Sequence, residues 1–160
     1  MADARIYAEL KKDHDRHREL LDQIEATSRG SEERRALFEE LRKELQAHAA
    51  AEEQALYALM LANPELRDEA RHSVAEHKEI DDLLGELVEI EPNDIGWVTK
   101  FREMRHRYEH HIDEEEEEMF PAAAEELTDG EENKAAEVFE QRKPEELERA
   151  EAEMPGDERD

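Results

Sequence analysis

Two histidine–glutamate pairs with the same spacing are the residues of this sequence best suited to binding a metal. His48 precedes Glu52 by four residues, and His111 precedes Glu115 by four. Residues four apart lie on one face of an α-helix, so each pair presents an imidazole and a carboxylate together. Mixed imidazole and carboxylate ligands suit iron, manganese and zinc. The two pairs therefore predict a metal site built by two helices.

An internal repeat joins these pairs to two further histidines. His111 follows His48 at the same interval at which His77 follows His14. The segments HAAAEEQALY and HIDEEEEEMF match around the first two, and DHDRHRELL and EHKEIDDLL match around the others. One constant offset relates both matches, so the chain reads as a helical hairpin used twice. The set of predicted metal ligands is His14, His48, Glu52, His77, His111 and Glu115.

Four long helices joined by short turns must position these residues. Gly30, Asn63 with Pro64, and the stretch 92–94 mark the breaks, and apolar residues recur at helical spacing between them. The predicted helices cover about residues 3–28, 31–62, 63–90 and 95–127. We predict an all-α, up-down-up-down four-helix bundle over residues 1–127. A short fifth helix over 128–143 would cap one end, and residues 144–160 would form an acidic tail, frayed or disordered.

The predicted ligands fall at one level of this bundle. His14 precedes the first turn by about as many residues as His48 follows it, and His77 and His111 flank the third turn in the same way. Two ionised carboxylates in one core layer would repel each other without a cation. If both carboxylates bridge two ions, each ion has four protein ligands. A solvent-derived bridge would supply a fifth ligand and leave a position for a small molecule.

Three other histidines leave alternatives open. His17 shares a helix face with His14. It is a candidate for a fifth metal ligand, for a hydrogen-bond partner of a ligand, or for a residue that only lines the pocket. His72 is expected at the surface, and binds the metal only if its helix bulges. His110 would need Glu114 as its partner and would break the common offset, so His111 is preferred to it.

Composition narrows the classes of function. The 48 acidic residues outnumber the 22 basic ones, giving a net charge of −26 that disfavours binding to nucleic acid. The absence of Cys excludes thiolate metal sites and disulfides. The sequence has neither an apolar run of about 20 residues nor a signal-peptide pattern, so we expect a cytoplasmic protein without a membrane partner.

The motifs together resemble the hemerythrin-like family, also described as the HHE cation-binding domain. They are LKKDH ending at His14, HAAAEE from His48, AEH ending at His77, and HHIDEEEEEMFP from His110, within a match over about residues 3–127. The resemblance implies a non-haem di-iron centre with an oxo or hydroxo bridge. It also implies terminal histidine ligands at His14, His48, His77 and His111, with Glu52 and Glu115 bridging two iron ions.

The sequence departs from the invertebrate oxygen carriers of that family in two places. Those proteins have a second histidine where Ser73 stands, and an aspartate five residues after the last histidine, where this chain uses Glu115 at four. The resemblance therefore implies binding or sensing of dioxygen or related small oxidants, such as peroxide and nitric oxide. The alternatives are a di-iron oxidase, a peroxide-decomposing enzyme, or an iron-handling protein on the same site.

Overall fold

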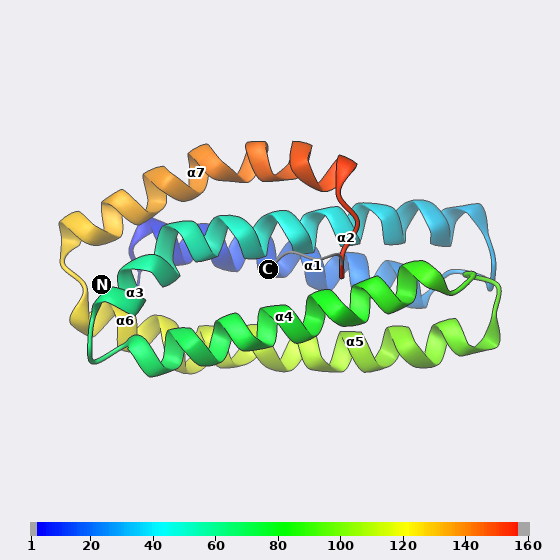
Figure 1. Cartoon of the computed structure of the whole chain (residues 1–160), viewed down its shortest axis with the longest axis horizontal. Helices are drawn as coiled ribbons and strands as arrows, with labels where there is room; N and C mark the ends of the chain where they lie inside the picture. Colours follow the sequence, from blue (N-terminus) through cyan, green and yellow to red (C-terminus); the bar gives the residue numbers. More distant parts are fainter. Residues whose placement is uncertain (1–2, 157–160) are drawn as a thin grey trace.

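The computed structural model describes residues 3–156, and these residues form helices and turns without any strand. Figure 1 shows long helices lying alongside one another, with a further helix across one side. The elements are α1 (Arg5–Glu25), α2 (Glu32–Glu52), η1 (Glu53–Tyr57), α3 (Ala58–Ala62), α4 (Arg67–Glu89), α5 (Ile95–Glu114), η2 (Glu115–Met119), α6 (Phe120–Glu126) and α7 (Asp129–Ala152).

Side-chain caps mark where several of these helices begin. The Ser31 side chain accepts a hydrogen bond from the backbone of Arg34 at the start of α2, and Asp94 does the same for Gly96 at α5. Thr128 and Glu131 form a reciprocal capping box at α7. The third predicted helix begins later than expected, at Arg67, because the four residues from Asn63 form a separate turn.

Two short π-helical segments interrupt otherwise continuous helices directly after the predicted ligand Glu52 and at the predicted ligand Glu115. In η1 the amide of Ala58 donates to the carbonyl of Glu53, and in η2 the amide of Phe120 donates to that of Glu115. Hydrogen bonds that span five residues define π geometry, which often occurs at functional sites. Each segment joins its neighbours into one rod, α2–η1–α3 or α5–η2–α6.

Two hydrophobic clusters fill the interior and leave a polar layer between them. One cluster contains Leu10, Leu56 and Phe120, and the other contains Leu20 and Trp97. Along α1, the buried residues His14 and His17 lie between Leu10 and Leu20. The predicted ligands of the other helices also fall between members of the two clusters, so apolar packing on both sides fixes their level.

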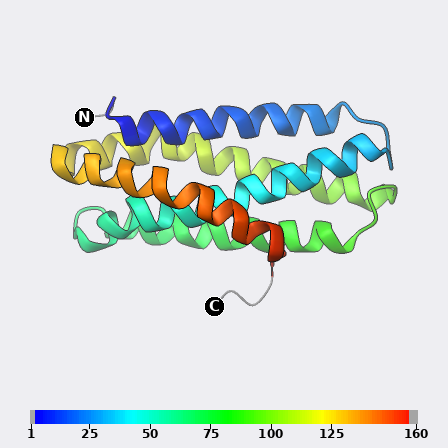
Figure 2. The same cartoon turned by 90° about the horizontal axis from the view of Figure 1, so that it is seen from above.

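The fifth helix is longer than the sequence predicts. It continues through Pro144 to Ala152, whereas we expected an end at about residue 143 and a frayed or disordered tail from residue 144. Packing explains the difference, because α7 lies along α2 (Figure 2) and buries Phe139 and Ala150. Arg42 also donates to the carbonyl of Ala150 at 2.6 Å, which anchors the end of the helix. The last four residues of the predicted tail, 157–160, lie outside the described part.

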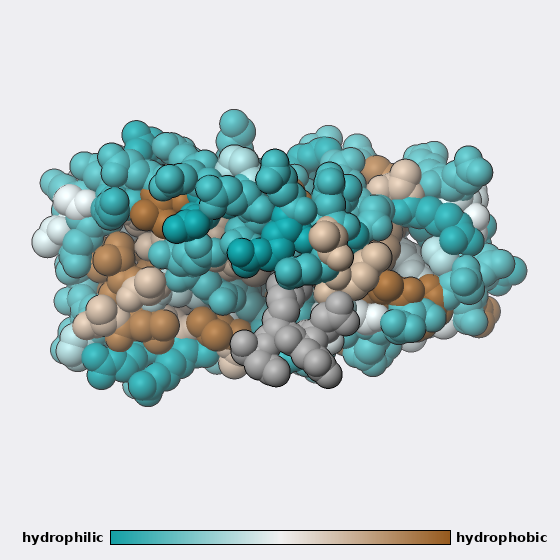
Figure 3. All heavy atoms as spheres, turned by 45° about the horizontal axis from the view of Figure 1, so that its top comes forward, coloured by the Kyte–Doolittle hydropathy of each residue, from teal (hydrophilic) through white to brown (hydrophobic). Residues whose placement is uncertain are grey.

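The surface is mainly hydrophilic on the face drawn in Figure 3. Within residues 3–156, no helix combines the length and the apolar character needed to cross a membrane.

Candidate metal centre

The structure brings all six predicted metal ligands together in the polar layer, and we call them the inner cluster. Possible ligand atoms of His14, His48, Glu52 and Glu115 lie within 4.8 Å of one another. Glu52 also belongs to a second such group with His77 and His111. All six side chains are buried. The cluster is thus two overlapping groups that share Glu52.

Each histidine of the inner cluster is held by a carboxylate on its outer nitrogen. The hydrogen bonds from Nδ1 are His14 to Glu116 (2.7 Å), His48 to Asp13 (2.8 Å), His77 to Glu53 (2.8 Å) and His111 to Glu76 (2.8 Å). Such partners fix both the tautomer and the orientation of a metal-binding histidine. With Nδ1 donating outward, the lone pair of each Nε2 is directed to the interior.

The atoms that face the interior are potential metal ligands. The distances from Nε2 to the nearest carboxylate oxygen are 3.3 Å for His14 to Glu115, 3.5 Å for His48 to Glu52, 3.4 Å for His77 to Glu52 and 3.4 Å for His111 to Glu115. These contacts lack hydrogen-bond geometry for three of the imidazoles. Within the described residues, Nε2 of His14, His48 and His111 and both oxygens of Glu52 have no hydrogen-bond partner. Buried unpaired polar atoms are costly, and imidazole nitrogens with carboxylate oxygens match the ligand preferences of iron, manganese and zinc. The residues present therefore fit bound metal.

Neighbouring carboxylates raise the pKa of two histidines of the inner cluster. Burial lowers the pKa of His14, but the carboxylates of Glu115 and Glu116 outweigh burial and raise this pKa to about 9. At His77 two neighbouring carboxylates likewise outweigh burial and raise the pKa to about 10. Since these carboxylates favour the protonated imidazole, a bound metal must compete with protons for both residues.

Two aromatic rings pack against the inner cluster from the π-helical segments and their ends. Tyr57 stacks on His77 with centroids 5.2 Å apart, and Phe120 stacks on His14 at 6.1 Å. The Tyr57 hydroxyl also donates to Oε2 of Glu115. In a regular α-helix a residue five positions after a glutamate would lie about 140° away. The π-turn brings it back towards the same face, which sequence periodicity did not indicate.

The three histidines that the sequence left open separate into one buried and two exposed side chains. His17 is buried beside His48, and its Nδ1 lies 2.6 Å from the hydroxyl of Tyr108. It forms a possible metal group with Asp13 and His48 but not with the glutamates of the inner cluster. His72 and His110 are 57% and 67% exposed, whereas the side chain selected by the repeat, at position 111, is 1% exposed. The structure thus places that histidine in the interior.

The carboxylates that hold the histidines were missed from the sequence. We expected Glu53 and Glu116 to face solvent or a neighbouring helix, and we assigned no role to Asp13 or Glu76. The offset of the repeat relates Asp13 to Glu76 and Glu53 to Glu116. Extending the repeat by one position on either side of the predicted ligands would have identified all four.

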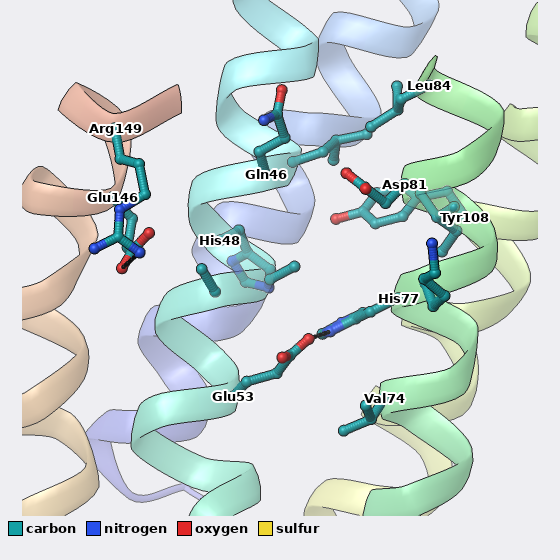
Figure 4. Close-up of a pocket in the computed structure, with 15 residues that line it drawn as sticks. Gln46, His48, Glu53, Val74, His77, Asp81, Leu84, Tyr108, Glu146 and Arg149 are labelled. Carbon is teal, nitrogen blue, oxygen red and sulfur yellow. Dashed lines mark hydrogen bonds and ion pairs between the residues drawn. The ribbon is translucent and has the colours of Figure 1, made fainter. Parts of the chain in front are cut away.

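A cavity of about 310 Å³ reaches the inner cluster between α2 and α4, next to α7. Figure 4 shows His48, His77 and Tyr108 on its wall, with Glu53 bonded to His77. Val74 and Leu84 add apolar surface. A molecule from solvent therefore has a mainly hydrophobic approach to two of the predicted ligands.

Comparisons with known proteins agree with the site. The family model described as Hemerythrin HHE cation binding domain matches residues 5–123. A crystal structure of a Hemerythrin HHE cation binding domain-containing protein from Mycobacterium kansasii superposes with a TM-score of 0.80 and 29% sequence identity. That match covers 93% of this chain and 90% of the other. A search of curated proteins finds no match. The match over residues 5–123 spans well over half of the sequence, and the chain belongs to the hemerythrin HHE cation-binding domain family.

Proposed function

We propose that this chain is a non-haem di-iron protein that binds or senses dioxygen or a related small oxidant, such as peroxide or nitric oxide. The site would lie inside an up-down-up-down four-helix bundle. His14, His48, His77 and His111 would be terminal ligands, and Glu52 and Glu115 would bridge the two ions. When bound, an oxo- or hydroxo-bridged iron pair supplies redox chemistry and a position for a small ligand.

The observation that carries the proposal is the set of unpartnered donor atoms in the inner cluster. Nε2 of His14, His48 and His111 and both oxygens of Glu52 are buried without a hydrogen-bond partner among the described residues. The two overlapping groups that share Glu52 support two ions rather than one. Mixed nitrogen and oxygen ligands are compatible with iron. The absence of thiolates excludes a structural zinc site of the cysteine type.

The surrounding side chains would control what reaches the ions. Tyr57 and Phe120 cover two of the imidazoles and help to exclude water. The cavity beside His48 and His77 supplies an approach for a small, weakly polar molecule. The hydroxyl of Tyr108 lies on that cavity wall and is bonded to His17, so its orientation is fixed.

Metal analysis of protein produced in iron-replete cells tests this proposal. We expect about two iron ions per chain, and an optical spectrum that differs between air and anaerobic reduction. Manganese added in place of iron provides a control for the specificity of the spectrum. A single zinc ion, or iron whose spectrum is unchanged by reduction and re-exposure to air, would contradict the proposal.

The cavity gives specific support to a second candidate, a di-iron oxidase or peroxide-decomposing enzyme on the same site. Its volume of about 310 Å³ is within the range of small-molecule pockets, roughly 300–1,000 Å³. Consumption of oxygen or peroxide by the iron-loaded protein over many turnovers would favour this candidate. Binding of about one oxidant molecule per metal site, without turnover, would favour the sensor. An iron-handling protein would instead have to release the metal. A cytoplasmic location and the absence of a nucleic-acid partner stay predictions.

A further inference from the structure

Helix α7, which corresponds to the predicted fifth helix, covers one half of the repeat and leaves the other half open. Helix α7 packs on α1, α2 and η1. Ala51 and Ala55 are buried in that half. The repeat relates these alanines to Glu114 and Glu118, which line a cavity of about 220 Å³ in the other half. We call this second space, between α4 and the α5–η2 rod, the acidic cavity. Small buried residues are thus replaced by carboxylates where no fifth helix packs.

The mouth of the acidic cavity carries a group of metal-binding side chains, which we call the outer cluster. It consists of His72, Glu76 and Glu114, whose ligand atoms lie within 4.8 Å of one another. Nε2 of His72 lies 3.3 Å from Oε2 of Glu76 and 3.3 Å from Oε1 of Glu114. One imidazole between two carboxylates is a donor set for a divalent transition metal, whereas magnesium and calcium prefer oxygen alone.

The two halves of the repeat place different cationic or metal-binding groups beside equivalent carboxylates. Asp13 holds His48, and the ammonium of Lys143 on α7 lies 2.8 Å from its Oδ2. Its counterpart Glu76 holds His111 through Oε1, but its other oxygen faces His72. The covered half therefore receives a cation from α7, while the open half presents a histidine that can itself bind a cation from solution.

The acidic cavity also reaches the inner cluster. His111 and Glu115 line its inner end. Nε2 of His111 and Oε1 of Glu115 are buried and have no hydrogen-bond partner among residues 3–156. One cavity thus has a partly exposed group of metal-binding side chains at its mouth and two residues of the inner cluster at its inner end. A net charge of −26 further concentrates cations near such an opening.

We propose that the acidic cavity is the route by which a divalent metal ion enters, and that the outer cluster binds this ion before it reaches the inner cluster. The destination of the ion rests on the proposed function, whereas binding at the outer cluster does not. Glu76 connects the two stages, because one of its oxygens belongs to the outer cluster while the other orients His111.

Manganese binding tests the outer cluster independently of iron. Free Mn²⁺ is titrated against the purified protein and measured by its electron paramagnetic resonance signal. The double variant His72→Ala, Glu114→Gln should bind one Mn²⁺ fewer per chain than the unaltered protein. The matched control is His106→Ala, Glu117→Gln, which removes the same residue types from exposed positions on the α5–η2 rod. Equal loss in both double variants would mean non-specific attraction to an acidic surface and would overturn the outer site.

Iron uptake tests the route. Metal-free protein is mixed with ferrous iron without oxygen, and unbound iron is trapped by a chelator after increasing times. The His72→Ala, Glu114→Gln variant should load at least about tenfold more slowly, since an acidic opening raises the rate of cation entry by about 10-fold or more. Its final iron content should equal that of the control. Unchanged uptake rates would overturn the entry route. If no variant retains iron, the proposed function fails, while the manganese result still decides the outer cluster.

Discussion

The carboxylate of Asp13 on α1 accepts a hydrogen bond of 2.8 Å from Nδ1 of His48 on α2. The repeat reproduces this contact in the second hairpin, where Glu76 on α4 accepts from His111 on α5. The two other carboxylates, Glu53 and Glu116, hold histidines across the remaining pairs of neighbouring rods. Every rod therefore supplies both an imidazole and a carboxylate that orients the imidazole of another rod.

The contact between Asp13 and His48 predicts a loss of metal affinity when the charge is removed. Asp13→Asn leaves the shape nearly unchanged but weakens the acceptor, so the affinity for iron should fall about 10- to 100-fold. Competition with a chelator measures this. Asp15→Asn, at an exposed position on the same helix, is the control and should leave affinity unchanged. Equal affinities of the two variants would contradict a role for Asp13 in orienting His48.

Adjacent histidines in α5 should behave differently. We expect His111→Ala to lose at least one iron ion and the optical absorption of the pair, because His111 is buried in the inner cluster. His110→Ala should keep most of both, because His110 is 67% exposed and contacts only Glu114 among the described ion pairs. Metal analysis and spectra of the two variants decide. The reverse outcome would mean that the repeat has been aligned one residue out of register.

The glutamate run after His111 should contain a single ligand. Glu115→Gln should lose most of the iron, since the amide cannot replace a charged bridging carboxylate, and Glu52→Gln should do the same. Glu117→Gln provides a matched control, because Glu117 is exposed on the same rod. The iron content per chain, measured after equal loading, checks the prediction. Full occupancy in either ligand variant would refute its bridging role.

Removal of the metal should lower the stability of the fold. Ligands that bind only the folded state contribute about 2.7 kcal/mol when present at 100 times their Kd. A chain of this size changes its Tm by roughly 2–4 °C for each kcal/mol, so the loaded protein should melt about 5–10 °C higher. Thermal unfolding followed by circular dichroism, before and after chelation, measures the difference. Identical melting curves would show that metal binding is not coupled to folding.

The Glu9 carboxyl on α1 predicts a pH effect away from the metal centre. Burial first, and then the neighbouring Glu140 on α7, raise its pKa from 4.5 to about 7. A raised carboxyl pKa means that the folded protein binds more protons than the unfolded chain, so stability falls as pH rises from about 4.5 to 7. Glu9→Gln should therefore increase the Tm at pH 8 but not at pH 4.

Solvent screening limits the size of the Glu9 effect to a few degrees. Glu19→Gln, at an exposed position on the same helix, should leave the Tm unchanged at both pH values. A Glu9→Gln variant whose Tm matches that of the unaltered protein at pH 8 would contradict the predicted repulsion.

The sequence predicted the helices and the grouping of the six residues because both follow from simple periods. Spacing of four residues placed His48 with Glu52, and the constant offset between the two hairpins added His14 and His77. The length of α7 could not be predicted in this way. A proline such as Pro144 normally breaks the interior of a helix, and only packing against α2 offsets the free-energy cost of keeping the helix continuous. The stacking of Tyr57 on His77 was also not predictable, because it depends on a change of helix type that apolar periodicity does not reveal.

The π-helical segments also determine which changes of chain length the protein can tolerate. Deleting one residue from the range 54–56 would restore a regular α-helix in which the tyrosine follows Glu52 by four residues, about 40° around the axis. The tyrosine would therefore stay on the face that carries the ligands, and α3 would keep its apolar face in the core. A deletion in the range 117–119 would have the same result for Phe120. A deletion in the regular part of either rod has no such compensation and would turn the residues on its two sides by about 100° relative to each other. We therefore expect natural one-residue changes of length in this chain to be confined to the π-helical segments and to the connections between the rods.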